Sequence, residues 1–125
     1  MKPVGEGFPK RLRVRRRREY LAVQRSAHRL VTPHFVVYGR RNGRAETRLG
    51  VTVSRKVGKA TVRNRVKRLC REAFRLNRGA LPSGIDLVMV ARAGRPATVQ
   101  QTVVDELLGA AGRVMQTSGR RRRRR

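Results

Sequence analysis

The sequence predicts an α/β domain of two layers, in which a small sheet of about four strands packs against helices. Residues 34–40 and 48–54 have the β-branched, aromatic or alternating composition of strands. Residues 85–91 are almost wholly apolar, as in a central strand buried on both faces. Apolar residues recur at helical spacing over residues 61–76 and 99–115. Because 125 residues suffice for only one compact domain, these elements are expected to share one core.

The chain is expected to begin with a basic lead-in and a short helix. Residues 1–14 are predicted to be extended, since Pro3 and Pro9 fall within them. Residues 15–26 are predicted to form a helix that is marginal alone and must dock on the sheet. We therefore expect the single folded domain to span residues 15–116.

A hairpin is predicted in the middle of the chain. Asn42 and Gly43 have the composition of a tight turn and would join the strands at residues 34–40 and 48–54. Alternation in the second strand predicts a core face and a partly open face. The core face would carry Leu49, Val51 and Val53, and the open face Thr52 and Ser54.

A strand–helix–strand unit is predicted over residues 48–91. Its helix is expected to begin at an N-cap, Thr61, because Gly58 interrupts the chain shortly before it. The helix is expected to stop near Asn77, since Gly79 and Pro82 follow.

A second long helix is predicted near the C-terminus. Thr98 opens a sequence that resembles a capping box, and the helix would run to about Met115. Its apolar stripe would consist of Val99, Val103, Leu107, Ala111 and Val114. Residues 117–125, which include six successive arginines, Arg120–Arg125, are expected to be a disordered tail.

The charge of the chain predicts a partner rich in phosphate. Lysine and arginine number 33 against 7 acidic residues, so the formal net charge is +26. RNA, DNA or an anionic membrane would satisfy such an excess. The membrane is disfavoured, because no apolar run approaches the ~20 residues of a spanning helix and no secretory signal is recognisable. A single cysteine agrees with a reducing compartment, so we expect a cytoplasmic protein.

The helix predicted after Thr61 is basic on one side. Its apolar stripe would be Val62, Val66, Leu69, Ala73 and Leu76. The opposite side gathers Asn64, Lys67, Arg68, Arg71 and Arg75, with Arg63 and Arg65 at the boundary. Like charges at this spacing repel and only Glu72 offsets them, so an external polyanion is expected. Asn64 either bonds a sugar or base edge or is simply polar at a helix start; spacing supports both equally.

Phosphate binding is also predicted just before this helix. Lys56 and Lys59 would lie beside the helix N-terminus and form a cradle for a phosphate group with it. The spacing of a nucleotide-binding loop is absent from this segment, which excludes that class of site.

The sequence contains no recognisable catalytic or metal-binding set. The acidic residues are scattered, and none pairs at the spacing of two-metal phosphodiester chemistry. His28, His34 and Cys70 lack the spacing of metal ligands, and Cys70 is expected to act as a small hydrophobe. We therefore expect no catalytic residue, metal or cofactor on the protein itself.

Tyr20 and Tyr38 have two interpretations. Spacing alone favours ordinary packing in or beside the core. In the second interpretation, Tyr38 shares the open face of the sheet with Thr52 and Ser54, and Tyr20 lies over that face. The resulting groove would hold a single strand of nucleic acid by stacking and backbone contact.

The residues from Arg48 to Phe74 closely resemble the signature of the bacterial ribonuclease P protein subunit family. Arg63-Asn64-Arg65, with Lys67-Arg68 and Arg71-Glu72 after it, matches the RNR motif of that family. The resemblance covers roughly residues 8–115, because further matches follow in order. These are Phe8-Pro9, the basic stretch to Arg18, Glu19-Tyr20, Phe35 to Tyr38, and Asp86 to Ala91.

The resemblance implies a fold and a function that composition could not give. The strand–helix–strand crossover would be left-handed, in the element order α-β-β-(β)-α-β-α. The protein would be a monomer that pairs one-to-one with a catalytic RNA, and the complex would remove the 5′ leader of precursor tRNA. The chemistry would belong to the RNA and the Mg²⁺ ions that it requires.

The resemblance also implies roles for individual residues. The catalytic RNA would contact Arg55, Lys56, Lys59, Arg63, Asn64, Arg65, Lys67, Arg68 and Arg71. The leader would contact Tyr20, Tyr38, Thr52 and Ser54. Gln24 stands where the family often has a second aromatic residue, and Arg120–Arg125 lie outside the family core. The alternatives are a structural RNA-binding protein of the ribosomal type, with no role in cleavage, and a nonspecific DNA-binding protein.

Overall fold

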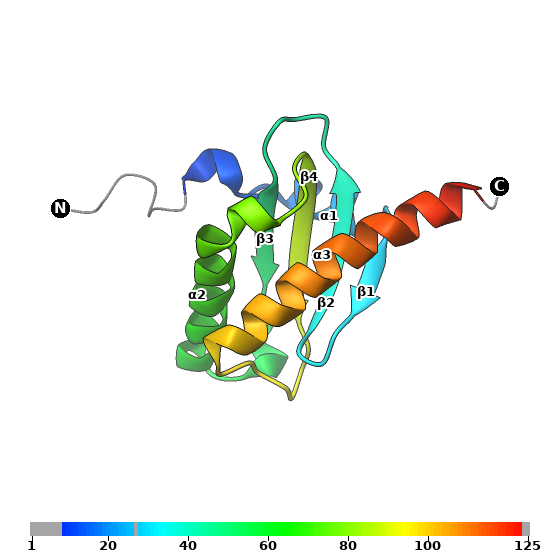
Figure 1. Cartoon of the computed structure of the whole chain (residues 1–125). Coiled ribbons are helices and arrows are strands. Elements are labelled where there is room, and N and C mark those ends of the chain that lie inside the picture. The colour runs from blue at the N-terminus through cyan, green and yellow to red at the C-terminus, as the bar shows by residue number, and fades with distance from the viewer. Residues whose placement is uncertain (1–8, 27, 124–125) are drawn as a thin grey trace.

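A four-stranded mixed sheet forms the centre of the computed structural model, which describes residues 9–26 and 28–123 (Figure 1). The spatial order of the strands is β1-β2-β4-β3. β2 pairs antiparallel with β1 and β4, whereas β3 pairs parallel with β4. The strands are β1 (Arg29–Val31), β2 (Phe35–Arg41), β3 (Arg48–Thr52) and β4 (Ile85–Ala91).

The helices lie on both faces of this sheet. α2 (Ala60–Leu76) and α3 (Gln100–Arg123) cover one face, and α1 (Arg17–Gln24) packs on the other (Figure 1). Three short 3₁₀ turns accompany them: η1 (Lys10–Leu12), η2 (Arg55–Val57) and η3 (Arg78–Ala80). The sequence therefore predicted the α/β class, the two long helices and the approximate number of strands correctly.

β4 is buried on both faces, which explains its central position. Leu87 and Met89 contribute to the larger core under α2 and α3, whereas Val88 belongs to the smaller cluster under α1. The predicted hairpin of residues 34–40 and 48–54 is wrong, because β4 lies between these two strands. A hairpin would have left the most apolar strand at an exposed edge, at a large hydrophobic cost.

The crossover from β3 through α2 to β4 is left-handed. In Figure 1 both strands run downward, and β4 lies to the right of β3. α2 packs with α3 on the face toward the viewer. This handedness is what the family resemblance implied, and it is opposite to that of nearly all such units.

The N-terminal lead-in packs more closely than an extended segment would. Leu12 and Val14 are fully buried, and the N–H of Val14 donates to the carbonyl of Leu49 over 2.9 Å. The folded domain therefore begins before residue 15. Residues 1–8 lie outside the described part of the chain.

The start of α2 and the apolar stripes of α2 and α3 differ from prediction. The N-cap of α2 is Lys59 and not Thr61, which lies inside the first turn. Leu76 and Val99 are 62% and 55% exposed, so neither belongs to its predicted apolar stripe. Phe74 is fully buried, so the buried stripe of α2 is centred near Cys70, which lies about 120° around the helix from Leu76.

The backbone of α3 stays helical to Arg123, where the sequence predicted a disordered tail from residue 117. Arginine is a strong helix former, and extending an existing helix avoids the cost of nucleation. In Figure 1 the end of α3 projects beyond β1, past the edge of the sheet. Arg124 and Arg125 lie outside the described residues.

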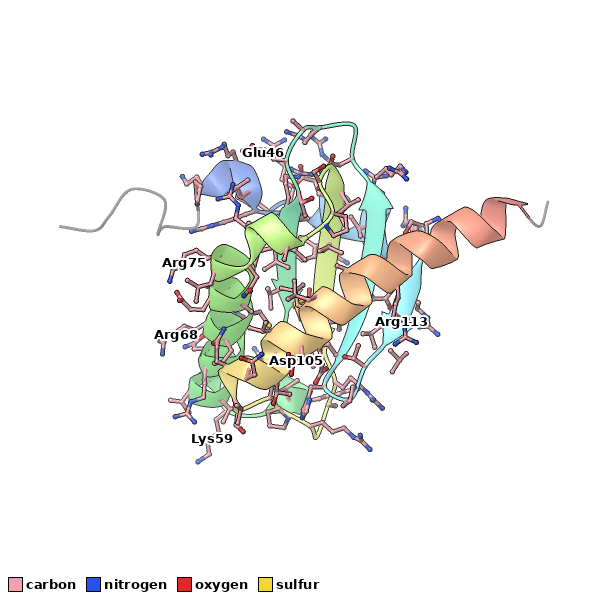
Figure 2. All side chains as sticks on the ribbon, viewed as in Figure 1. Glu46, Lys59, Arg68, Arg75, Asp105 and Arg113 are labelled. Atoms are coloured by element: carbon pink, nitrogen blue, oxygen red, sulfur yellow. The ribbon has the colours of Figure 1, made fainter. Side chains whose placement is uncertain are left out.

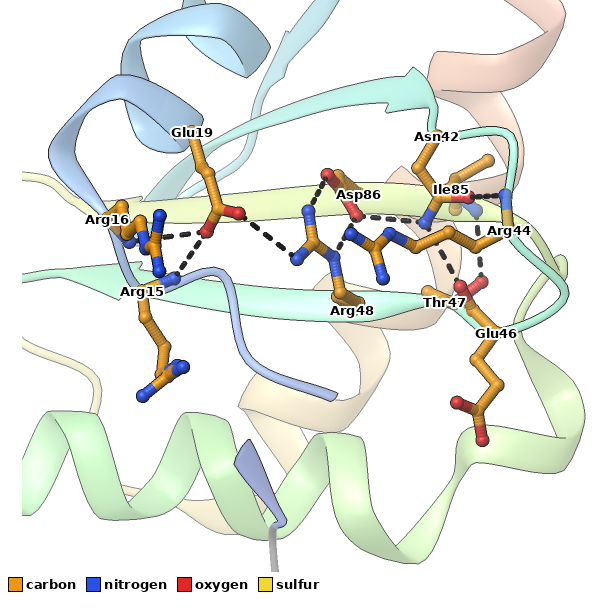
Figure 3. A network of polar contacts seen from close by, with 10 residues as sticks. All are labelled: Arg15, Arg16, Glu19, Asn42, Arg44, Glu46, Thr47, Arg48, Ile85 and Asp86. Atoms are coloured by element: carbon orange, nitrogen blue, oxygen red, sulfur yellow. Dashed lines mark hydrogen bonds and ion pairs between the residues drawn. The ribbon is translucent and has the colours of Figure 1, made fainter. Parts of the chain in front are cut away.

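Arg48 and Asp86 form a buried ion pair that joins β3 to β4 (Figure 3). Nε and Nη2 of Arg48 donate to the two carboxylate oxygens of Asp86 over 2.8 and 2.7 Å. The two residues lie directly opposite each other in the parallel strand pair, and they are 8% and 1% exposed. Asn42 donates to the same carboxylate over 2.9 Å and so ties the β2–β3 loop to it.

Glu19 connects α1 to this ion pair. Its carboxylate accepts hydrogen bonds from the backbone N–H groups of Arg15 and Arg16 and from Nη1 of Arg48. Burial raises the pKa of Glu19, but these donors and the charge of Arg48 outweigh it, so the pKa lies below its usual range. α1 is therefore docked through a carboxylate that remains ionised at neutral pH.

Replacing Asp86 by asparagine is expected to lower the free energy of unfolding by about 3–5 kcal/mol. The change leaves the buried guanidinium of Arg48 without its counter-charge. Urea denaturation followed by circular dichroism would measure it. Glu46→Gln is the matched control, since it also removes one carboxylate, from an exposed pair with Arg11, and should cost at most about 1 kcal/mol. Equal losses in the two variants would contradict the importance of the buried pair.

Candidate nucleic-acid interface

The outer side of α2 is a basic surface. Asn64, Arg65, Arg68 and Arg71 are exposed on it, and Arg63 and Lys67 are partly buried at its margins. The opposite side of α2 packs into the core through Val66, Cys70, Ala73 and Phe74. Figure 2 shows Lys59, Arg68 and Arg75 projecting from this region away from the sheet. We call the six residues from Arg63 to Arg71 named above the α2 surface.

Among the described residues, the positive charge of the α2 surface is not neutralised by neighbouring acids. Glu72 is the one acid of the helix, and it accepts two hydrogen bonds from Arg75 at 2.6 and 3.3 Å. Within the part of the chain that the structure describes, no carboxylate pairs with Arg65, Arg68 or Arg71. Exposed arginines without internal partners are suited to bidentate contact with phosphate.

Three more cations extend this surface at the N-terminus of α2. Arg55 and Lys56 lie on η2 and Lys59 is the N-cap; all three are exposed. No side chain caps the first turn of α2, so its N–H groups and these cations lie at the same end of the helix. This arrangement can bind an anion.

Tyr20 lies across the edge strand β3. Its hydroxyl accepts a hydrogen bond from the N–H of Val51 over 3.1 Å and donates to the carbonyl of Val51 over 3.4 Å. The ring covers Gly50 so closely that a Cβ atom there would lie 2.8 Å from it. Gly50 is therefore required for this position of Tyr20.

Tyr38 lies on the same face of the sheet. It is opposite Val88 of β4, and Val88 is in turn opposite Gly50 of β3. Both tyrosines are half-buried and pack against the cluster of Val14, Val23 and Val88. The packing interpretation and the groove interpretation of the tyrosines are thus compatible, because each ring contacts the core and retains exposed surface.

A short strip of this face lies next to the tyrosines. Val36, Val90 and Thr52 lie opposite one another on β2, β4 and β3, and all three are partly buried. Tyr20, Tyr38, Thr52 and this strip form what we call the tyrosine face. Ser54 is not on it, because β3 ends at Thr52 and Ser54 precedes η2, beside the cations at the start of α2. Gln24 is the last, partly buried residue of α1.

The two surfaces meet around the edge of β3. Burial raises the pKa of Tyr20, partly opposed by its bonds to Val51 and by the positive charge of Arg71 on α2. Arg71 is therefore close enough to Tyr20 to act on its phenol electrostatically. A single continuous surface can thus run from α2 around β3 to the tyrosine face.

Sequence reasoning missed the role of Gly50. A glycine inside an alternating strand is a known signal of close approach by another group, and that signal was present. Val36 and Val90 carried no such signal, because their exposure depends on how far α1 extends over the sheet.

Cys70 and His34, two side chains that could be chemically reactive, are engaged in the packing of the fold. Cys70 is fully buried in α2, and burial raises the pKa of its thiol to about 12. His34 contacts Glu106 of α3. Among the described residues, no group of three or more histidine, cysteine, aspartate or glutamate side chains could hold a metal ion. The same residues include no helix with the length and apolarity needed to cross a membrane.

Known proteins resemble this chain in both sequence and fold. The family model of ribonuclease P matches residues 8–115. The ribonuclease P protein component of Desulfovibrio desulfuricans is 48% identical over 105 residues, which cover 81% of each chain. That of Thermotoga maritima is 46% identical over 87 residues, 70% of this chain and 74% of the relative.

Solved structures agree with these sequence matches. The RNase P protein of Thermotoga maritima superposes with a TM-score of 0.73 at 40% identity, over 81% of this chain and 96% of that one. The RNase P protein of Staphylococcus aureus gives a TM-score of 0.70 at 26% identity, over 79% and 91% of the two chains. With a family match over most of its length, and with this fold and basic helix, the chain belongs to the ribonuclease P protein family.

Proposed function

We propose that this chain is the protein subunit of ribonuclease P. It binds the catalytic RNA through the α2 surface and the cations at the start of α2. It binds the 5′ leader of precursor tRNA on the tyrosine face and so assists endonucleolytic removal of that leader. The observation that carries this proposal is the unneutralised α2 surface on a fold shared with ribonuclease P proteins.

The α2 surface is suited to a folded RNA because it is rigid and rich in arginine. Its side chains project from a helix of 17 residues that is fixed to the core along its opposite side. Arginine binds phosphate oxygens in pairs, and a helix surface presents several arginines in a fixed pattern. Backbone phosphates of a folded RNA are positioned equally rigidly, so shape as well as charge contributes to recognition.

The tyrosine face is suited to a single strand. Half-buried aromatic rings present a surface on which an unpaired base can stack, and such stacking tolerates different sequences. The hydroxyl group of Thr52 adds a partner for hydrogen bonds beside the rings. Because β3 separates this face from α2, one protein can hold the leader and the catalytic RNA at the same time.

We assign hydrolysis of the phosphodiester bond to the catalytic RNA and its Mg²⁺ ions. The protein would contribute binding energy and would orient the substrate, so that the substrate reaches the reactive geometry more often. We further propose that one copy of the protein acts per catalytic RNA, in the cytoplasm.

Reconstitution tests the proposed function. The protein is added to its cognate catalytic RNA at low Mg²⁺, and cleavage of a precursor tRNA is followed over time. We expect faster cleavage than with the RNA alone, and no cleavage by the protein alone. A ribosomal-type binding protein would give no stimulation and no preference for precursor over mature tRNA.

Arg65→Ala and Arg68→Ala are each expected to weaken binding of the catalytic RNA without lowering the free energy of unfolding. Each change removes one phosphate contact, so the slope of log affinity against log salt should fall by about 0.7–0.9. Filter binding between 50 and 200 mM salt, about the range in which such contacts respond strongly, would measure it. Arg113→Ala is the charge-matched control, from the exposed side of α3. A control slope that falls as much as the others would refute a specific role of α2.

Gly50→Ala is expected to reduce the preference for precursor over mature tRNA by roughly 5- to 150-fold. The new methyl group would displace the ring of Tyr20, and stacking of one base contributes about 1–3 kcal/mol. Equilibrium binding of the two tRNAs to the holoenzyme would measure this preference.

Gly109→Ala on α3 is the matched control for that variant, because a Cβ there meets nothing within 4 Å. Affinity for the catalytic RNA should be the same in both variants, which separates loss of the tyrosine face from general unfolding. If Gly50→Ala keeps the full preference for precursor tRNA, binding of the leader does not depend on the position of Tyr20.

A further inference from the structure

A pocket of about 550 Å³ lies away from α2, where three segments of the chain converge. η1 and the residue after it form one wall, the entry to α1 forms the second, and the β2–β3 loop forms the third. We call it the N-terminal pocket. Its lining residues are Lys10, Arg11, Arg13, Arg15, Arg16, Arg18, Glu19, Arg44 and Arg48.

The N-terminal pocket has a strong excess of positive charge. Eight of the nine described residues that line it are cations, and Glu19 is the only carboxylate among them. That carboxylate is already engaged by two backbone N–H groups and by Arg48. Arg11 has an exposed contact of 3.3 Å with Glu46, a kind of pair that contributes little. A concave surface lined by one sign of charge concentrates its potential and attracts counter-ions.

Arg48 forms a rigid floor of the pocket. It is 8% exposed, and the bidentate bond to Asp86 fixes the plane of its guanidinium. A guanidinium has five N–H donors, of which Asp86 and Glu19 occupy three. The other two remain for a ligand, in directions that the ion pair determines.

Arg44 brings a second guanidinium toward that of Arg48. Figure 3 shows its side chain extended from the β2–β3 loop toward Arg48. The loop is held in place, since the N–H of Arg44 donates to Asn42 over 2.8 Å and Asn42 also bonds Asp86. Two cations held near each other repel, and an anion between them would convert that repulsion into attraction.

We propose that the N-terminal pocket binds a phosphodiester group of an RNA backbone, as a third contact besides the α2 surface and the tyrosine face. The identity of the ligand as RNA rests on the proposed function. Arg48 would bind the phosphate at the bottom of the pocket, and Arg15, Arg18 and Arg44 would contact it from the rim. Since Arg48 and Gly50 are two residues apart on β3, the pocket adjoins the tyrosine face, and either RNA could supply the phosphate.

The first test uses inorganic pyrophosphate and the isolated full chain. NMR is expected to show saturable shifts of the side-chain N–H signal of Arg48 and of the amides of residues 15–19. Arg44→Gln and Arg18→Gln should each weaken this response by roughly 10-fold, and Arg113→Gln should leave it unchanged. Shifts confined to α2, or an unchanged response in both rim variants, would overturn the proposal whatever the RNA experiments show.

The second test identifies which RNA supplies the phosphate. The same variants are compared for binding to the catalytic RNA alone, and then, as holoenzymes, for binding to precursor tRNAs with short and long leaders. Weaker binding of the catalytic RNA assigns the phosphate to it, whereas a loss that appears only with longer leaders assigns it to the leader. Losses no larger than that of Arg113→Gln in both arms refute an RNA ligand.

The two tests separate this proposal from the proposed function. If the wild-type protein fails to stimulate cleavage while pyrophosphate still binds the pocket, ribonuclease P function is wrong and the anion site stands. If cleavage is stimulated but the rim variants bind pyrophosphate and both RNAs normally, the function stands and the pocket proposal falls.

Discussion

The ion pair between Arg48 and Asp86 is the contact on which the arrangement of this protein depends. It joins the edge strand β3 to the central strand β4, and through Asn42 and Glu19 it fixes the β2–β3 loop and α1. Burying two charges has a high desolvation cost, which is recovered only when geometry and additional hydrogen bonds are good. The bidentate contact and the two further bonds meet that condition. The ion pair is also shared with the lining of the N-terminal pocket, so one interaction serves the core and the surface.

The two faces of the sheet differ in what they support. The face under α2 and α3 carries the larger core, which supports the rigid α2 surface. The face under α1 is covered only in part, because α1 has eight residues, and the uncovered part becomes the tyrosine face. β3 lies at the boundary, with Gly50 beneath Tyr20 on one side and Arg71 nearby on the other. The two surfaces that we propose to bind RNA therefore meet on one domain without sharing residues.

The sequence predicted the parts that depend on local pattern. Alternation in residues 49–53, apolar continuity in β4 and the polarity of α2 are properties of short segments, and the structure contains all three. It could not predict that β4 separates β2 from β3, because strand order depends on which strand gains most from burial on both faces. The left-handed crossover came only from the family resemblance. The N-terminal pocket was missed because its cations lie far apart in the sequence, at residues 10–18, 44 and 48.

The hydroxyl of Tyr20 also has a consequence for the exposed edge of the sheet. β3 is an end strand of the sheet, and unpaired backbone groups on such a strand can recruit a strand from another molecule. Here the N–H of Val14 occupies the carbonyl of Leu49, and the hydroxyl of Tyr20 occupies both outward groups of Val51. The side chain whose ring we propose as a stacking surface for RNA thus also occupies backbone groups at which another strand could pair, so a substitution of Tyr20 would affect both properties.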